Sequence, residues 1–184
     1  LTPISLNDSA VVIGSGMVGI FVVQALRAAG CGTVIAVDLE QSKLDLALKL
    51  GADHGLLAAE VDVPEEVRKL TDGRGANIAV EVVGNTIAVN TAINSLRKGG
   101  ALTIVGNLAP TVEFPLQEVV TRQISVAGSC SSCGEYPACL DMIARGVVNV
   151  DALVIKIAPL SEGADWFRKL YSQEENLMKV ILTP

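Results

Sequence analysis

Gly14, Gly16 and Gly19 have the spacing G-x-G-x-x-G, with an apolar run before them and a segment of helical periodicity after them. In that context the first glycine allows a tight turn, the second lets a pyrophosphate approach the main chain, and the third lets the helix pack close to the sheet. The amides of Met17 and Val18 at the helix start then face the phosphates. The spacing therefore predicts a dinucleotide-binding turn.

An acidic residue, Asp38, ends the next apolar run and stands 19 residues after Gly19. A carboxylate at this place binds the 2′-hydroxyl of an adenosine ribose and repels a 2′-phosphate, so we expect NAD in preference to NADP. No arginine lies beside Asp38 in the sequence to reverse that preference. Lys43, one turn into the following helix, could bind a ribose hydroxyl or tolerate a phosphate, and its effect on the preference stays open.

Short apolar runs alternate with longer segments of helical periodicity along the chain. The strands and helices that this pattern predicts would hold the glycine turn and Asp38 in place. We expect strands at 10–13, 33–37, 54–57, 77–83, 101–105 and 124–127. We expect helices at 18–29, 40–50, 64–71 and 86–96, and a later one at 164–170 whose Trp166, Phe167 and Leu170 form a packing face. Gly30 would close the helix at 18–29 and Gly51 the helix at 40–50. The pair Gly99 and Gly100 would close the helix at 86–96, and Asn85 would cap the N-terminus of that same helix. The strand runs are mostly continuous and apolar, which indicates an α/β fold: one doubly wound parallel sheet of the Rossmann type, a dinucleotide-binding domain over 1–184.

The composition limits the classes of function. The chain has 184 residues, is 50% hydrophobic and 18% charged, and carries a formal net charge of -6 without a cluster of lysine or arginine. We therefore expect no nucleic-acid partner, and the absence of an apolar run of about 18 residues argues against a membrane partner. A small-molecule partner is expected. The chain begins at Leu1 without methionine or a signal segment, so we expect a cytoplasmic location and a domain cut from a longer protein.

The sequence offers only weak signals for a metal site or for catalytic residues. Cys130 and Cys133 have ligand-like spacing, with Cys139 nearby, but a closed zinc site takes four ligands and the remaining candidates, Cys31 and His54, are distant in sequence. We expect loop or buried thiols, no metal site and no catalytic residue in this chain. Neither tyrosine has a lysine four residues on, which excludes the short-chain reductase pattern.

Six blocks in order carry a family resemblance, and they are G14-S-G-M-V-G19, V34-I-A-V-D-L39, L48-K-L-G-A-D-H54, E81-V-V-G84, L96-R-K-G-G-A-L-T-I-V-G106 and V126-A-G-S-C130. Together they resemble the cofactor domain of zinc-dependent medium-chain alcohol dehydrogenases, most closely the polyol and threonine dehydrogenase branch. The resemblance implies that Val83 and Gly84 border the adenosine side. It also implies that Val105, Gly106 and Asn107 lie beside the nicotinamide ribose and that the backbone at Ser129 and Cys130 binds the carboxamide.

The resemblance further implies an oxidoreductase that passes hydride between an alcohol or polyol and NAD, with catalytic zinc in a separate domain preceding Leu1. This chain alone should then bind NAD without turnover, and residues from about 155 to 184 would return toward that missing domain. Family members pair sheet edges near Ala109 to Phe114, which makes a homodimer plausible. Two alternatives stay open: a non-catalytic NAD-sensing Rossmann module and an S-adenosylmethionine-dependent methyltransferase. The alcohol substrate is not readable from these residues.

Overall fold

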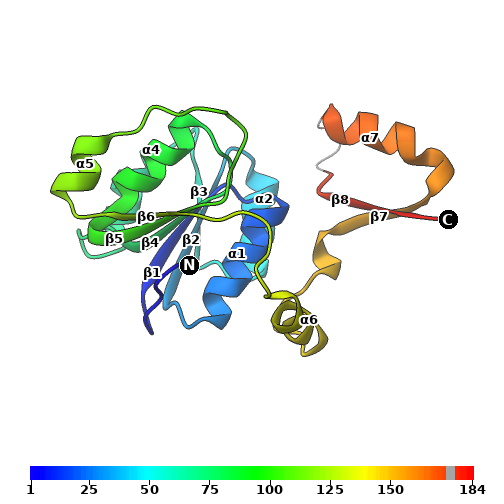
Figure 1. Ribbon diagram of the computed structural model, residues 1–184, viewed down its shortest axis with the longest axis horizontal. Coiled ribbons are helices and arrows are strands. Elements are labelled where there is room, and N and C mark those ends of the chain that lie inside the picture. Colours follow the sequence, from blue (N-terminus) through cyan, green and yellow to red (C-terminus); the bar gives the residue numbers. More distant parts are fainter. Residues whose placement is uncertain (173–176) are drawn as a thin grey trace. The chain divides into compact units, whose positions relative to one another are not determined.

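The computed structural model describes residues 1–172 and 177–184 (Figure 1). The chain divides into two compact units, Leu1–Tyr136 and Pro137–Pro184. We call them unit 1 and unit 2 and treat each by itself. In the described residues every helix is too short or too polar to traverse a lipid bilayer.

Unit 1 is built on a six-stranded parallel sheet. Its strands are β1 (Ser9–Ile13), β2 (Thr33–Asp38), β3 (His54–Leu57), β4 (Ala76–Glu81), β5 (Leu96–Ile104) and β6 (Ser125–Gly128). They lie in the order β3-β2-β1-β4-β5-β6, and every neighbouring pair is parallel. This is the doubly wound order, so the fold class predicted from the alternating pattern is confirmed.

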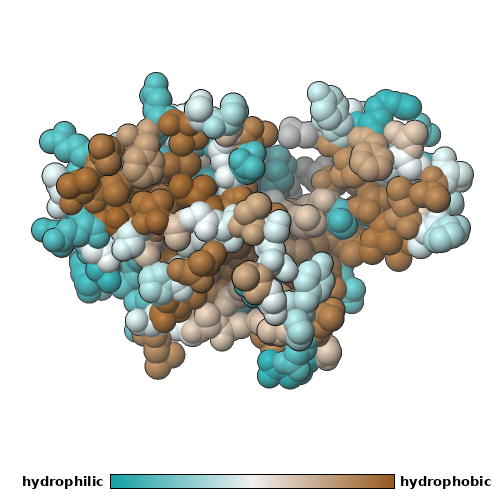
Figure 2. Space-filling model, in the orientation of Figure 1, coloured by the Kyte–Doolittle hydropathy of each residue, from teal (hydrophilic) through white to brown (hydrophobic). Residues whose placement is uncertain are grey.

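Helices cover both faces of the sheet. They are α1 (Met17–Ala28), α2 (Gln41–Lys49), α3 (Val63–Lys69), α4 (Thr86–Ser95) and α5 (Leu116–Thr121). Figure 1 shows α1 and α2 on one side of the sheet and α4 and α5 on the other, as right-handed crossovers on the two halves require. Apolar side chains gather over α5 in Figure 2, where Leu116 and Val120 are exposed.

The central strands form a core of small aliphatic side chains. Residues Ala10 to Val12 and Val34 to Ala36 are fully buried, because helices shield both faces of β1 and β2. One face packs against α3 and α4 through Val67, Ala92 and Ile93. Continuous apolar runs therefore follow from two-sided burial, which is why the sequence showed no polar alternation.

Most predicted helix ends are confirmed, and one is wrong. Gly30 and Gly51 follow α1 and α2 with positive φ angles of 98° and 120°, and the Asn85 side chain accepts a hydrogen bond from the Ala88 amide at 2.8 Å at the start of α4. Gly99 and Gly100 do not close α4. That helix ends at Ser95, and the extended backbone of β5 begins at once with Leu96.

The helix α6 (Tyr136–Ala144) begins at the last residue of unit 1, and the rest of it belongs to unit 2. Two short 3-10 turns follow at Asp151–Leu153 and Leu160–Glu162. In unit 2 the strands β7 (Val154–Pro159) and β8 (Lys179–Thr183) pair in parallel, with α7 (Gly163–Tyr171) between them. The prediction that Phe167 lies on a packing face is wrong for this chain, since that side chain is 72% exposed. Trp166 instead bonds Glu162 at 3.0 Å on the surface. The predicted return segment at 155–184 falls in this unit, and its residues 173–176 lie outside the described part.

Replacing Asn85 with alanine should destabilise unit 1 by about 1 kcal/mol, because the Ala88 amide loses its acceptor at the start of α4. Urea unfolding followed by circular dichroism measures the change. Asn94→Ala is the matched control, since Asn94 is exposed on the same helix and its side chain caps nothing. Equal stability of Asn85→Ala and the control would contradict the cap.

Candidate functional site

The strand order reverses between β1 and β4, and doubly wound folds bind ligands in the crevice outside the carboxyl ends of the strands at such a point. Four predicted groups meet at that edge, because the turn Gly14–Gly16 follows β1, Asp38 ends β2, and the turns Val82–Gly84 and Val105–Asn107 follow β4 and β5. The topology thus brings together positions that are far apart in the sequence. It is the place where such folds bind ligands.

The three motif glycines have three different structural reasons. Gly14 has a φ of +97°, and a Cβ there would lie 2.8 Å from a methyl carbon of Val83. At Gly19 a Cβ would overlap the carbonyl oxygen of Gly14. At Gly16 a Cβ would meet nothing within 4 Å. Packing therefore accounts for Gly14 and Gly19 but leaves Gly16 unexplained by any protein contact, as expected where a ligand approaches the main chain.

The start of α1 is suited to an anion. Its N-cap residue, Gly16, offers no side chain to the first turn, and that turn contains no acidic residue. The first amides of a helix lack intrahelical partners and carry partial positive charge. Met17 and Val18, whose amides were predicted to face the phosphates, are thus the first two residues of a helix whose N-terminus has no side-chain cap.

Asp38 lies against the glycine turn. One carboxylate oxygen accepts a hydrogen bond from the Ser15 amide at 2.7 Å, and the other accepts from Leu39 and Glu40 at 2.8 and 3.1 Å. The Lys43 ammonium lies 3.9 Å from the second oxygen and 2.7 Å from the Glu40 carboxylate. The Asp38 side chain keeps 11% of its surface exposed. Asp38 therefore fastens the turn after β1 to the turn after β2, a role the sequence did not show.

The turns after β4 and β5 touch backbone to backbone. Gly84 has a φ of +84°, and a Cβ there would overlap the main chain of Gly106 and Asn107. A Cβ at Gly106 would in turn overlap the main chain of Val83 and Gly84. The Ala109 amide also donates to the Gly84 carbonyl at 2.8 Å. These two glycines form a close crossing of loops at the crevice wall.

Glu81 is a residue of this edge that sequence reasoning missed as a functional candidate. It is fully buried, and one carboxylate oxygen accepts from the amides of Val83 and Gly84, both at 2.7 Å. Its other oxygen is buried without a hydrogen-bond partner in the described part of the chain. Such an oxygen costs about 1 to 3 kcal/mol. An acid ending an otherwise apolar strand run was the available signal.

The predicted carboxamide segment follows the carboxyl end of β6. The Ser129 amide donates to the Ile104 carbonyl at 2.8 Å, which extends the pairing of β5 and β6 by one residue. Cys130 and Cys133 are exposed on the loop that follows, and the amide of Cys133 lowers the pKa of the Glu135 carboxyl by donating to it. Cys31 differs, since burial raises the pKa of its thiol. Within residues 1–172 and 177–184 no group of three or more His, Cys, Asp or Glu is placed to hold a metal ion.

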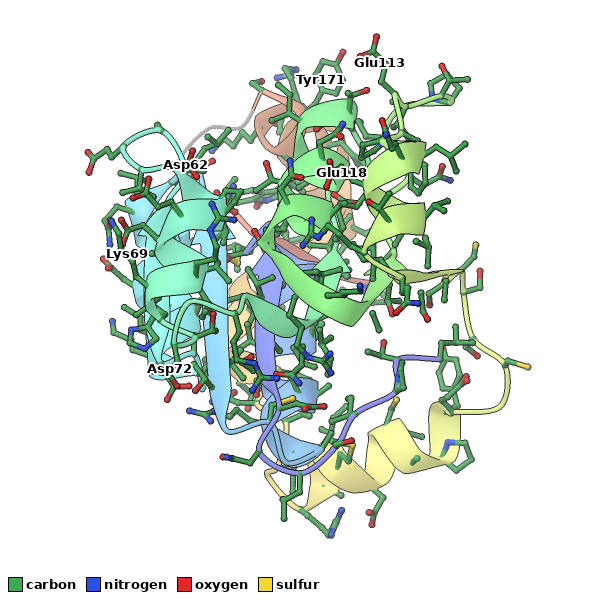
Figure 3. All side chains as sticks on the ribbon, turned by 90° about the vertical axis from the view of Figure 1, so that its left-hand side faces the viewer. Asp62, Lys69, Asp72, Glu113, Glu118 and Tyr171 are labelled. Carbon is green, nitrogen blue, oxygen red and sulfur yellow. The ribbon has the colours of Figure 1, made fainter. Side chains whose placement is uncertain are left out.

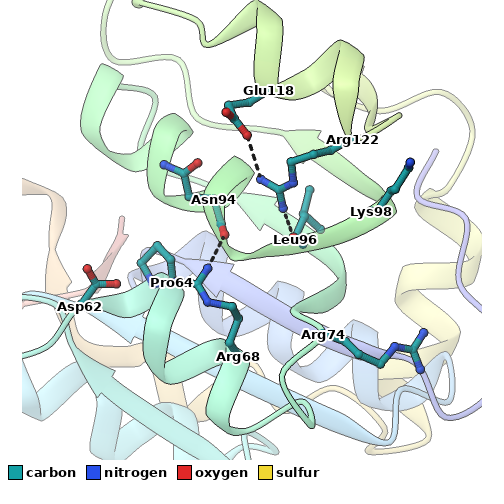
Figure 4. Close-up of a pocket in the computed structure, with 9 residues that line it drawn as sticks. All are labelled: Asp62, Pro64, Arg68, Arg74, Asn94, Leu96, Lys98, Glu118 and Arg122. Atoms are coloured by element: carbon teal, nitrogen blue, oxygen red, sulfur yellow. Dashed lines mark hydrogen bonds and ion pairs between the residues drawn. The ribbon is translucent and has the colours of Figure 1, made fainter.

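A cavity of about 600 Å³ is lined by residues of α3, α4, β5 and α5 and their adjoining turns (Figure 4). Four cations and two acids line it, and its two best-placed arginines are already engaged. Arg68 donates to the Asn94 carbonyl at 3.5 Å, while Arg122 donates to the Leu96 carbonyl and lies 3.9 Å from Glu118. Both arginines serve the carboxyl end of α4, which has no glycine cap. We therefore assign this cavity to helix termination and place the candidate site at the carboxyl edge.

The surface of unit 1 mixes its charges. Asp62, Asp72, Glu113 and Glu118 project from it (Figure 3). Lys69 lies among acids, and its hydrogen bond to Glu66 raises its pKa. Acidic and basic side chains therefore alternate around α3, and the net charge of -6 is not gathered on one face there.

Comparison with known proteins agrees with this geometry. The family model for zinc-binding dehydrogenases matches residues 17–145. The chain belongs to the zinc-binding dehydrogenase family. Sorbitol dehydrogenase of Bacillus subtilis (strain 168) is 32% identical over 185 residues, which cover 100% of this chain and 52% of that protein. (R,R)-butanediol dehydrogenase of Neisseria gonorrhoeae is 30% identical over 97% of this chain and 51% of its own length.

Solved structures of this dehydrogenase family match the chain closely. The structure of 2R,3R-butanediol dehydrogenase from Bacillus subtilis has a TM-score of 0.91 and 28% identity, and the match covers all of this chain and 52% of that one. The chain thus spans about half the length of the relatives it matches. The family resemblance read from the six sequence blocks is confirmed, and the chain corresponds to the cofactor-binding half of these dehydrogenases.

Two alanine substitutions in the glycine turn should separate packing from ligand access. Gly19→Ala should destabilise unit 1 by about 1 to 3 kcal/mol or more, because the new methyl overlaps the Gly14 carbonyl. Gly16→Ala should change stability by about 0.5 kcal/mol or less, since its φ of -69° suits alanine and the space is open. Urea unfolding measures both. The reverse order of stabilities would contradict this account of the turn.

Proposed function

We propose that this chain is the NAD-binding half of an oxidoreductase that transfers hydride between a secondary alcohol or polyol and the nicotinamide ring. The observation that carries the proposal is the open main chain at Gly16, at an uncapped helix tip, with the Asp38 carboxylate bound to the adjacent Ser15 amide. A pyrophosphate on the helix tip and a ribose at the carboxylate suit these two features together. The named activities of the relatives, on sorbitol and butanediol, support the substrate class.

In this proposal the chain's own residues bind and orient the cofactor. Gly16, Met17 and Val18 receive the pyrophosphate. Asp38 and Lys43 read the adenosine ribose. The remaining contacts are the ones the family resemblance implies, namely Val83 and Gly84 on the adenosine side, Val105, Gly106 and Asn107 beside the nicotinamide ribose, and the backbone of Ser129 and Cys130 at the carboxamide. Among the described residues no three or more His, Cys, Asp or Glu side chains are grouped to hold zinc. Hydride transfer would also need the part of the protein that corresponds to the rest of the relatives' length.

The alternative of a non-catalytic NAD sensor shares every cofactor contact and is less well supported, because the matching relatives are dehydrogenases. The methyltransferase alternative lacks a use for the open space at Gly16, since S-adenosylmethionine has no pyrophosphate. A cytoplasmic location belongs to the proposal as well. It agrees with all four cysteines being free, as is usual in a reducing compartment.

The chain should bind NAD more tightly than NADP, and Asp38→Asn should reduce both NAD affinity and the discrimination against NADP. The loss expected for NAD is about tenfold or more, because a hydrogen bond to a charged group contributes about 1.5 to 3 kcal/mol. Isothermal titration calorimetry with NAD, NADP and S-adenosylmethionine measures this. Asn keeps one acceptor oxygen for the Ser15 amide, but its NH2 group replaces the oxygen that accepts from Leu39 and Glu40, so circular dichroism of the variant accompanies the titration.

Asp45→Asn is the matched control, since Asp45 lies on α2 with its side chain exposed and bonded to Gln41. It should bind NAD like the wild type. Gly16→Ala should stay folded and lose NAD binding, because its methyl occupies the ligand space. Equal affinity of the wild type for NAD and NADP, or tighter binding of S-adenosylmethionine, would overturn the proposal.

We further propose a homodimer that pairs the β6 edges. The support is an edge strand with Val126 40% exposed, together with the exposed apolar residues Phe114, Leu116 and Val120 in and before the helix α5 that precedes this strand. Sedimentation velocity should show a dimer for the wild type and a monomer for Val126→Lys. Leu48→Lys on α2 introduces the same charge at a comparably exposed site and should leave the dimer intact. A monomeric wild type would contradict the interface.

A further inference from the structure

We propose that Glu81 is a positioning residue for cofactor binding, whose buried carboxylate holds the turn after β4 in contact with the turns after β1 and β5. This inference rests on the proposed function, because it assigns Glu81 a role in the same site. Glu81 itself is fully buried and touches no ligand space directly. Its effect on binding would run through Val83, Gly84 and Gly106.

Glu81 binds two turns at once. Its carboxylate oxygen accepts from the Val83 and Gly84 amides, both at 2.7 Å, which holds the turn after β4. Its backbone carbonyl accepts from the Val105 and Gly106 amides at 2.8 and 3.1 Å, which holds the turn after β5. One residue therefore sets where the main chains of these two turns cross.

The third turn is reached through packing. The amide of Val82 donates to the Ile13 carbonyl at 3.0 Å, which places the residues after β4 beside the end of β1. Methyl carbons of Val82 and Val83 would lie 3.0 and 2.8 Å from a Cβ at Gly14, so both side chains fill the space above that glycine. A shift of Val83 would therefore press on the first turn of the dinucleotide motif.

Fold stability alone does not account for a long polar side chain at this position. The carboxylate buries a second oxygen that no described group satisfies, and a glutamine would bury an NH2 group in the same place while keeping an acceptor for the two amides. Polar groups left in such a state occur preferentially at functional sites, where geometry rather than stability is maintained. The position of Glu81 beside the switch point, paired with Ile13 of β1 and Ile104 of β5, is such a site.

The test compares Glu81→Asp and Glu81→Gln in the 184-residue chain. The aspartate keeps the charge but is too short to hold both amides, so NAD affinity should fall at least tenfold, about 1.4 kcal/mol. The glutamine keeps the accepting oxygen at the right reach, so its NAD affinity should stay within about threefold of the wild type. Calorimetry gives the affinities, and circular dichroism and urea unfolding give the folded fraction at the same temperature.

Ligands that are fragments of NAD distinguish a residue that positions several turns from a residue that makes a single contact with the cofactor. Glu81→Asp should weaken the binding of both AMP and nicotinamide mononucleotide, because it displaces turns on both sides of the cofactor. Asp38→Asn should weaken AMP alone. Ser95→Ala is the control for general destabilisation, since Ser95 is a buried polar residue that bonds Thr91 within α4. It should leave both affinities unchanged.

The outcomes are distinguishable. A wild-type chain that fails to bind NAD sinks the proposed function. If the wild type binds NAD, any of three results contradicts the positioning role. Glu81→Asp binds NAD as tightly as the wild type, or Glu81→Gln loses as much NAD affinity as Glu81→Asp, or Ser95→Ala loses as much NAD affinity as Glu81→Asp. Should Glu81→Asp not fold, amide hydrogen exchange of the wild type and Glu81→Gln decides instead. Slow exchange of the Val83 and Gly84 amides in both supports the role, and fast exchange in either overturns it.

Discussion

Close approach of main chain to main chain at one edge of the sheet is the constraint on which this structure depends. A methyl group at Gly19 would overlap the carbonyl of Gly14, and one at Gly84 or Gly106 would overlap the neighbouring turn. The first contact sets how near α1 packs to β1, and the second sets how the turns after β4 and β5 cross. Removing side chains at these positions allows four loops to meet around one crevice.

Main chain brought so close leaves amide groups that strands and helices cannot satisfy, and two carboxylates take up that task. Asp38 accepts from three amides, including that of Ser15 in the glycine turn, and Glu81 accepts from two more. Each acid stands at the carboxyl end of its strand, where the chain leaves the ladder and its amides turn inward. Charge-assisted hydrogen bonds of this kind are the stronger ones, so the loops of the crevice are held by electrostatics as well as by packing.

The fold could be predicted from sequence because its signals are local. Apolar runs, helical periodicity and the glycines after α1 and α2 placed most elements within a few residues. The failures lie where tertiary structure decides. Gly99 and Gly100 look like a helix end, yet β5 starts at Leu96, because two distant arginines rather than a glycine serve the end of α4. The exposure of Phe167 cannot be read from its spacing, since the same period describes a face covered by another part of a protein and a bare one.

The same limit applies to Asp38. Its place at the end of β2 was predictable from sequence, but the number of its hydrogen-bond acceptor positions that backbone amides already occupy was not. A carboxylate offers about four acceptor positions, and three are already used by backbone amides in this structure. Under the proposed function, little capacity remains for a ribose to gain many hydrogen bonds there. The preference for NAD would then come chiefly from the repulsion between the Asp38 charge and a 2′-phosphate. The Lys43 ammonium, 3.9 Å away, opposes that repulsion, while Glu40 draws the same ammonium to itself at 2.7 Å. Cofactor choice in this chain thus depends on the balance among three charged side chains rather than on the acid alone.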